Sequence, residues 1–184
     1  MKNDIQYLSR KNIDAVKWDD CITQSPQGRI YAYSWYLDQM ADNWDALVLN
    51  DYEAVMPLPW RKKWGIKYIY QLPFVQALGI FGVNINLDNT IISFFENIPR
   101  NYLYLNLNMY NDVSHLEQAF INNREVNILI RKNYILSLNL SYQELYQNCS
   151  RNAHRNINKA LHSGIQINQN ISIEDIFALH HDRF

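Results

Sequence analysis

The sequence is poor in cysteine, glycine and proline. In 184 residues it has two cysteines, five glycines and five prolines. Cys21 and Cys149 are too few and too far apart in the chain for a disulfide scaffold or a zinc site. We expect each to be a buried or half-buried free thiol. The low glycine and proline content excludes a collagen.

Long apolar runs and an excess of charge of one sign are also missing. No apolar run approaches the ~20 residues of a membrane span, and residues 1–7 lack the apolar segment of a signal peptide. We therefore expect a soluble, cytoplasmic protein. The 17 Lys+Arg and 18 Asp+Glu residues leave a net charge of −1, so no global field would hold the chain on DNA or on an anionic membrane. Any electrostatic site must be a local patch.

The sequence does have enough apolar residues for a core. Hydrophobic residues make up 48% and aromatic residues 14%, and a chain of this length needs no metal or disulfide to fold. The predicted strands are 5–8, 46–49, 53–58, 66–70, 102–107, 126–130, 134–140 and 165–167. The predicted helices are 15–22, 34–43, 89–97, a long stretch from a capping box at 141–144 to 163, and a last helix that begins at 172–175. This mixture predicts one α+β domain with a mixed sheet.

The most informative segment is a basic stretch in the second half of the chain. Arg151, Arg155 and Lys159 are spaced i, i+4, i+8 and share one face of a helix, with about 6 Å between neighbours. No acidic residue lies between positions 147 and 169, and Asn152 adds an amide donor. The face is therefore a solvated helix surface, a site for a phosphate or carboxylate, or a nucleic-acid contact, and an anionic partner would offset the repulsion between the cations.

A second basic cluster is formed by Arg61, Lys62 and Lys63, with Lys67 close behind. It lies between two predicted strands, so we expect it in a turn. Either it is ordinary solvated loop charge, or this loop and the helix 151–159 flank one anion-binding cleft.

Other combinations of reactive residues are weaker. His180 and His181, followed by Asp182, suggest a metal site, but adjacent helical histidines point about 100° apart whereas metal ligands are spaced i, i+4. His115 and Glu117 have no nucleophile at a defined spacing. Because GxSxG, GxxxxGK[ST] and GxGxxG are all absent, hydrolase, P-loop and Rossmann oxidoreductase functions lack their usual support.

The basic segment resembles a stretch of the FemAB-like peptidoglycan-bridge aminoacyltransferases, which belong to the GNAT acyltransferase superfamily. The pattern is Ser-x-Asn-x-x-Arg-Asn-Ile-x-Lys-Ala-x-x-x-Gly, and it is carried by Ser150, Asn152, Arg155, Asn156, Ile157, Lys159, Ala160 and Gly164. Upstream, 33–37 is similar to a Trp-containing helix of that family. Residues 55–65 and 70–79 look like its β-hairpin and Pro-Phe turn. The order strand, two helices, strand meander, helix, strand, helix, strand also fits a GNAT unit.

The resemblance implies a GNAT-like domain over 1–170 and, at 171–184, the start of a truncated helix that leads to a second unit. It implies an N-acyl- or aminoacyl-transferase with acyl-CoA or aminoacyl-tRNA as donor. The expected substrate is a small-molecule or nucleotide-linked anion that bears phosphate. Arg151, Asn152, Arg155 and Lys159 would contact it, with the cluster 61–63 as second choice, and no catalytic base is identified.

Two departures from the family pattern favour a different function. Acyl-CoA-dependent GNAT enzymes carry Arg/Gln-x-x-Gly-x-Gly/Ala, whose backbone amides hold the pyrophosphate at a helix N-terminus, whereas residues 151–155 contain no glycine. FemAB-like enzymes also have a phosphate-binding lysine shortly after the Trp, where this chain has residues 38–41 without lysine. The alternative is a non-catalytic ligand- or protein-binding domain with a degenerate GNAT fold.

Overall fold

The computed structural model describes residues 4–83, 87–111, 113, 128–134, 136–167 and 170–181. The chain separates into two compact units, Met1–Ile130 and Arg131–Phe184, and each is described by itself. The expected limits of a GNAT-like domain, 1–170, and of a truncated helix, 171–184, stay predictions.

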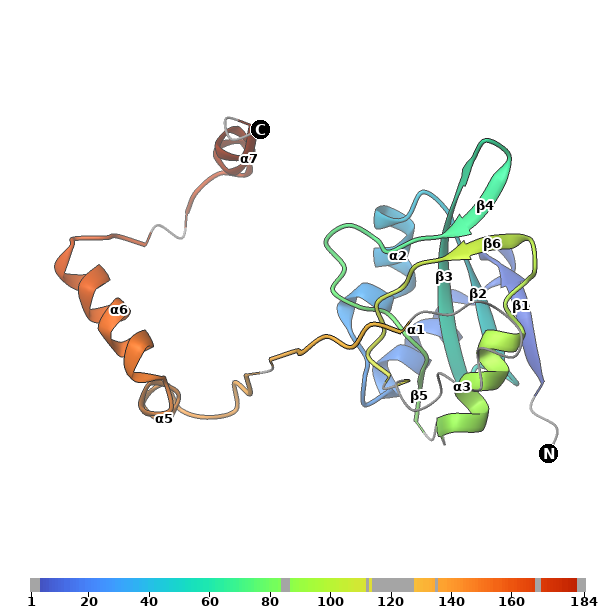
Figure 1. Cartoon of the computed structure of the whole chain (residues 1–184), viewed down its shortest axis with the longest axis horizontal. Coiled ribbons are helices and arrows are strands. Elements are labelled where there is room, and N and C mark those ends of the chain that lie inside the picture. The colour runs from blue at the N-terminus through green and yellow to red at the C-terminus, as the bar shows by residue number, and fades with distance from the viewer. Residues whose placement is uncertain are drawn as a thin grey trace. The chain divides into compact units, whose positions relative to one another are not determined.

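The first unit is built on a mixed sheet. The described residues contribute six strands: β1 Ile5–Ser9, β2 Trp44–Leu49, β3 Ala54–Lys63, β4 Ile66–Ile69, β5 Phe81–Gly82 and β6 Tyr102–Leu105. Their order is β1-β2-β3-β4-β6, with β5 paired to the start of β3. All pairs are antiparallel except β4 and β6, which are parallel. The predicted α+β class with a mixed sheet is confirmed (Figure 1).

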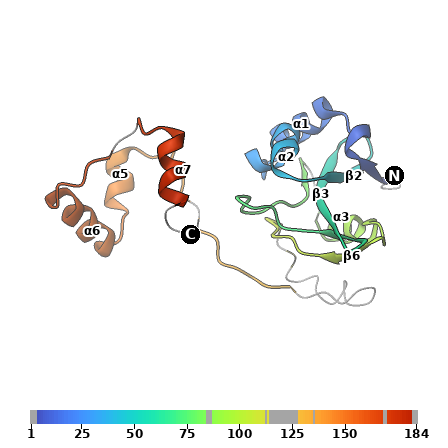
Figure 2. The ribbon, with the colours of Figure 1, turned by 90° about the horizontal axis from the view of Figure 1, so that it is seen from above.

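Helices cover both faces of this sheet. The helical segments of the unit are η1 Arg10–Asn12, α1 Ala15–Gln24, η2 Ile30–Ala32, α2 Ser34–Met40 and α3 Leu87–Glu96. Figure 2 shows α1 and α2 on one face and α3 on the other. Asp14 begins α1, because its side chain accepts hydrogen bonds from the backbone amides of Val16 and Lys17. None of the helices in the described ranges is long and apolar enough to cross a bilayer.

The two faces of the sheet have separate apolar cores. Under α1 and α2, Val48 packs in a cluster with Trp18 and Leu37. On the α3 face, Leu47 packs in a cluster with Phe94. Neighbouring strand residues point to opposite faces, so a strand covered on both sides is apolar at nearly every position. This is why β2 is buried at all six of its residues.

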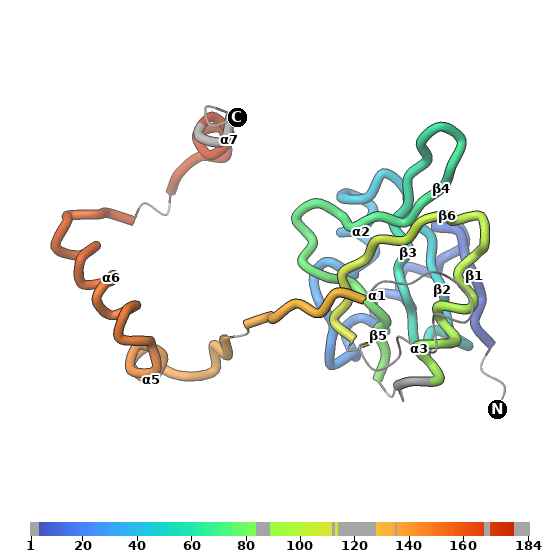
Figure 3. The backbone as a smooth tube through the Cα atoms, viewed as in Figure 1, coloured from blue at the N-terminus to red at the C-terminus, as the bar shows by residue number. Residues whose placement is uncertain are grey.

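The predicted turn at residues 61–63 is wrong. Arg61, Lys62 and Lys63 belong to β3, which continues past Trp60 and pairs with β4. The turn itself is two residues long, Trp64-Gly65, and both have positive φ (51° and 84°). Two successive residues of this kind make the type I′ turn that matches strand twist, and the hairpin of β3 and β4 extends from the sheet (Figure 3).

The second unit contains α5 Tyr142–Gln147, α6 Arg151–His162 and α7 Ile173–His181. The capping box is confirmed: Ser141 and Glu144 exchange hydrogen bonds at the start of α5. The single long helix expected up to residue 163 is wrong, because Ser150 adopts an extended conformation and caps a new helix through the amide of Ala153. Gly164, with φ 68°, follows the end of α6.

Three strands expected in the later part of the chain are not found where the structure describes them. Residues 128–130, the described part of 134–140, and 165–167 are not in strands, and 126–127 lie outside the described residues. Leu138 and Ile167 are mostly exposed. A strand needs a hydrogen-bonded neighbour, and alternation of apolar residues does not supply one.

Candidate functional site

The α6 face, defined as Arg151, Arg155 and Lys159, is a regular helical surface as predicted. All three residues lie within α6 and are exposed. Among the described residues, no ion pair neutralises any of them. Asn152 accepts a hydrogen bond from Nη2 of Arg155 at 2.8 Å, which orients that guanidinium along the helix. No carboxylate of the described residues therefore competes for these three cations.

Aromatic rings join α5 to α6, a contact that the sequence did not predict. The ring of Tyr146 on α5 contacts the ring of His154 on α6 edge-on, with 4.4 Å between centroids. Tyr142 stacks on Tyr146 at 6.2 Å. The i, i+4 spacing of the two tyrosines in the sequence indicates that their rings can stack. The contact of Tyr146 with His154 joins α5 to α6.

The cluster at 61–63 does not form one basic patch. Arg61 makes a two-point contact with the carboxylate of Asp42, with Nε–Oδ2 at 2.5 Å and Nη2–Oδ1 at 3.1 Å, and lies 4.3 Å from the ring centroid of Tyr70. The Asp42 carboxylate raises the pKa of Arg61, and Arg61 in turn lowers the pKa of Asp42. Lys62 points to the opposite side of β3 from Arg61 and Lys63, because strand side chains alternate.

The two basic clusters lie in different units. The cluster 61–63 belongs to Met1–Ile130 and the α6 face to Arg131–Phe184. The hypothesis that both flank one cleft stays a prediction.

A buried polar cluster lies on the α3 face of the sheet, and sequence reasoning missed it. Asp45, only 6% exposed, accepts hydrogen bonds at Oδ2 from the hydroxyls of Tyr7 (2.5 Å) and Tyr102 (3.0 Å), and at Oδ1 from the amide of Arg10 (3.1 Å). Burial, and then the bond to Asp45, raise the pKa of Tyr7 to about 12. Burial also raises the pKa of Tyr102. Both tyrosines are therefore neutral donors at physiological pH.

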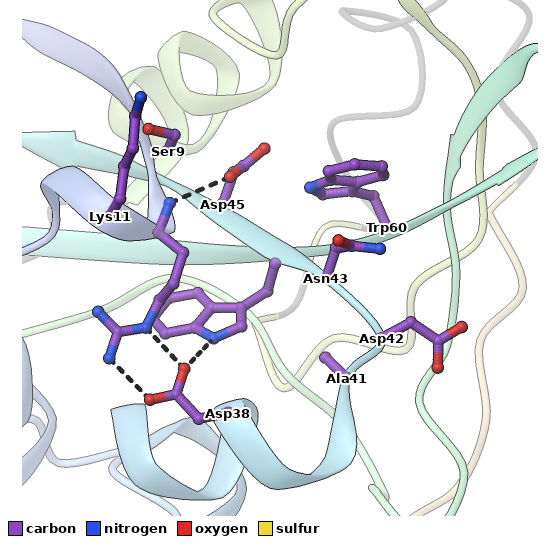
Figure 4. A pocket seen from close by; sticks show the side chains of 10 residues that line it. Ser9, Lys11, Asp38, Ala41, Asp42, Asn43, Asp45 and Trp60 are labelled. Carbon is purple, nitrogen blue, oxygen red and sulfur yellow. Dashed lines mark hydrogen bonds and ion pairs between the residues drawn. The ribbon is translucent and has the colours of Figure 1, made fainter.

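From this cluster, Asp45 and Arg10 line a hollow of about 330 Å³, called here the Asp45 hollow (Figure 4). It is lined by Ser9, Arg10, Lys11, Asp38, Ala41, Asp42, Asn43, Trp44, Asp45 and Trp60. Within it, Arg10 donates from Nε (2.6 Å) and Nη2 (2.7 Å) to Asp38, which also accepts from Nε1 of Trp44 (2.8 Å). This pairing with Arg10 lowers the pKa of Asp38.

Trp60 has an unsatisfied polar atom. Its Nε1 is buried and has no hydrogen-bond partner within the described ranges. A buried donor without a partner costs about 1–3 kcal/mol. The nitrogen-bearing edge of the ring is turned toward Asp45 across the hollow (Figure 4).

The remaining candidates give no site. Cys21 is buried, and burial raises the pKa of its thiol to about 11. Cys149 is exposed, so the expectation that both thiols are buried or half-buried is wrong for it, because it joins α5 and α6, which have no buried residues. Across the described ranges no group of three or more His, Cys, Asp or Glu residues is placed to hold a metal ion. His115, Glu117 and Asp182 lie outside the described residues.

No family model matches the chain, and comparisons with curated proteins and with solved structures find no significant match.

Proposed function

We propose that the chain is a GNAT-like domain of a FemAB-type N-acyl- or aminoacyl-transferase, and that the α6 face binds the phosphate of a nucleotide-linked substrate. The carrying observation is that Arg151, Arg155 and Lys159 line one exposed face of α6 without a carboxylate partner in the described structure. Like charges at this spacing destabilise a helix. A bound anion would offset the repulsion between the three cations and so stabilise α6.

The first unit supports this proposal through its order of elements. A strand, two α-helices, a three-strand meander, the short strand β5, a helix and a strand follow one another along 5–105. This is the first part of the order that the GNAT resemblance implies. The return of the chain from β4 through α3 to a parallel β6 gives the mixed sheet.

In such an enzyme an amine attacks an activated ester or thioester, with acyl-CoA or aminoacyl-tRNA as the donor. The reaction depends on holding the two reactants in line and on stabilising the oxyanion, and a covalent protein nucleophile is not required. The role of Arg151, Arg155 and Lys159 is to hold the anionic part of the substrate, with Asn152 orienting Arg155.

The function is tested by measuring the Kd of UDP and of inorganic pyrophosphate for the full chain by calorimetry. Lys159→Ala should raise the Kd about fivefold, because it removes one of three cations at roughly 1 kcal/mol. Lys132→Ala, which removes one exposed positive charge elsewhere in the same unit, should leave the Kd unchanged. Equal effects of the two variants, or no binding by the unmodified chain, would remove the α6 face from the site.

A non-catalytic binding domain is the second candidate, and one observation favours it. At the start of α6 the backbone amide of Ala153 donates a hydrogen bond to the side chain of Ser150. This amide is therefore not available to a cofactor pyrophosphate. Thermal unfolding with acetyl-CoA separates an acyl-CoA-dependent transferase from a non-catalytic domain. A cofactor at a hundredfold excess over its Kd stabilises the fold by about 2.7 kcal/mol, whereas a domain without a cofactor site shows no shift.

A further inference from the structure

The Asp45 hollow differs from the α6 face because most of its charges are balanced: among the described residues only Asp45 and Lys11, one charge of each sign, line it without an ion pair. Asp38 is engaged by Arg10 and Trp44, and Asp42 is engaged by Arg61. A cationic ligand would therefore find no free carboxylate at Asp38 or Asp42. An anionic ligand would meet a lining with three carboxylates and two cations. The charge of the hollow thus favours a neutral ligand.

Two hydrogen-bonding positions on residues that line the hollow are unfilled by the part of the chain that the structure describes. The first is the buried Nε1–H of Trp60, which can only donate. The second is Oδ1 of Asp45, which accepts one bond, from the amide of Arg10, while Oδ2 accepts two. An ionised carboxylate has about four acceptor positions, so Oδ1 has one left.

A group that accepts from Trp60 and donates to Asp45 is a hydroxyl, because each hydroxyl offers one donor and two acceptor lone pairs. The indole of Trp60 supplies apolar wall beside Asp45 (Figure 4). Ser9 and Asn43 add further polar atoms to the lining. Binding pockets combine apolar surface with a few such placed polar groups.

We propose that the Asp45 hollow binds a neutral, polyhydroxylated ligand, a sugar or polyol, with one hydroxyl between Trp60 Nε1 and Asp45 Oδ1. This site lies in Met1–Ile130 and shares no residue with the α6 face. Its test is therefore independent of the test of the proposed transferase function.

The test uses the indole N–H signals of the ¹⁵N-labelled full chain. The five tryptophans give separate cross-peaks, and Trp60→Phe identifies the signal of Trp60. D-glucose and glycerol should move that signal saturably. The signal of Trp18, whose Nε1 already donates to the carbonyl of Ala32 at 2.8 Å, should stay in place. Sodium acetate and methylammonium chloride, at equal concentration and constant ionic strength, should leave the Trp60 signal unmoved.

Calorimetry with the better of the two neutral probes then tests the contact itself. Trp60→Phe keeps an aromatic ring and removes the N–H, and should raise the Kd at least fivefold while the circular dichroism spectrum is unchanged. Trp64→Phe is the matched control, because Trp64 is 89% exposed at the turn between β3 and β4. A response to acetate or methylammonium alone would overturn the proposal. The absence of any shift of the Trp60 signal with every probe would also overturn it, because ligands would then not reach the Trp60 N–H.

Discussion

At the scale of single residues, the raised pKa of Tyr7 makes the stability of the fold depend on pH. The pKa of its hydroxyl is raised to about 12, whereas an unfolded tyrosine has a pKa near 10. The folded state therefore holds its proton more tightly. The stability from this shift is fully present below pH 10 and is lost as the pH rises toward 12. Urea unfolding between pH 9 and 12 should show a fall in the free energy of unfolding that is smaller in Tyr7→Phe.

In that variant burial still raises the pKa of Tyr102, although the contribution from Tyr7 is lost, so part of the fall should remain. If wild type and Tyr7→Phe lose the same stability across this range, Tyr7 is not held by Asp45 in the way the structure describes.

The two cysteines should differ in reactivity. Cys21 is buried, with a pKa raised to about 11, and its Sγ lies 3.7 Å from the carbonyl oxygen of Phe81. Cys149 is exposed. Because the thiolate is the reactive form and needs access, Ellman's reagent at pH 8 should titrate one thiol in the native chain and two in guanidinium chloride. Cys149→Ser should lose the fast phase, and two fast thiols in the native chain would contradict this packing.

Residue spacing predicted one candidate site and could not predict the other. The α6 face follows from local helical periodicity, which the sequence contains directly. The cluster around Asp45 joins Tyr7, Asp45 and Tyr102, which are far apart in the chain. They meet because β1 pairs with β2 in a register that places Ser9 opposite Asp45, and β6 is added beyond β4. Such registers depend on the whole sheet.

At the scale of elements, the N-terminus of α1 depends on one side chain. Asp14 accepts hydrogen bonds from the amides of Val16 (3.0 Å) and Lys17 (3.2 Å). Asp14→Ala leaves these amides without that acceptor and should lower the free energy of unfolding by about 1 kcal/mol. Asp20→Ala, in the same helix and exposed, should change it by less than about 0.5 kcal/mol. Urea unfolding of both variants tests the cap, and a larger loss in Asp20→Ala would contradict it.

Elements with local signals were predictable, and elements that depend on a distant partner were not. The hairpin around residues 50–51 and the capping box at 141–144 were predicted from turn and cap chemistry, and both are present. The segment 134–140 has the apolar alternation of a strand, yet its described residues are not in one. The cations at 61–63 were expected in a turn because they are polar, but pairing with β4 extends β3 through them.

At the scale of the whole molecule, packing is concentrated in the first unit. The buried apolar residues of the described chain lie between Ile13 and Tyr102, and α5 and α6 have none. Leu58→Ala removes a side chain that is 0% exposed and should lower the free energy of unfolding by about 2–5 kcal/mol. Leu161→Ala, at a site 70% exposed on α6, should change it by less than about 0.5 kcal/mol. Near-ultraviolet circular dichroism during urea unfolding measures both, and equal losses would contradict this distribution of packing.

The pairing of β1 with β2 has a kinetic consequence. The hairpin of β2 and β3 closes over a turn of a few residues, whereas the register of Ile5 with Leu49 closes a loop of about 40 residues that contains α1 and α2. Long loops lose more chain entropy before any contact forms, and folding slows as the mean sequence separation of contacts grows. We expect the central hairpin to form early in refolding. The Asp45 cluster should assemble late, because it needs β1 from one end of the unit and β6 from the other.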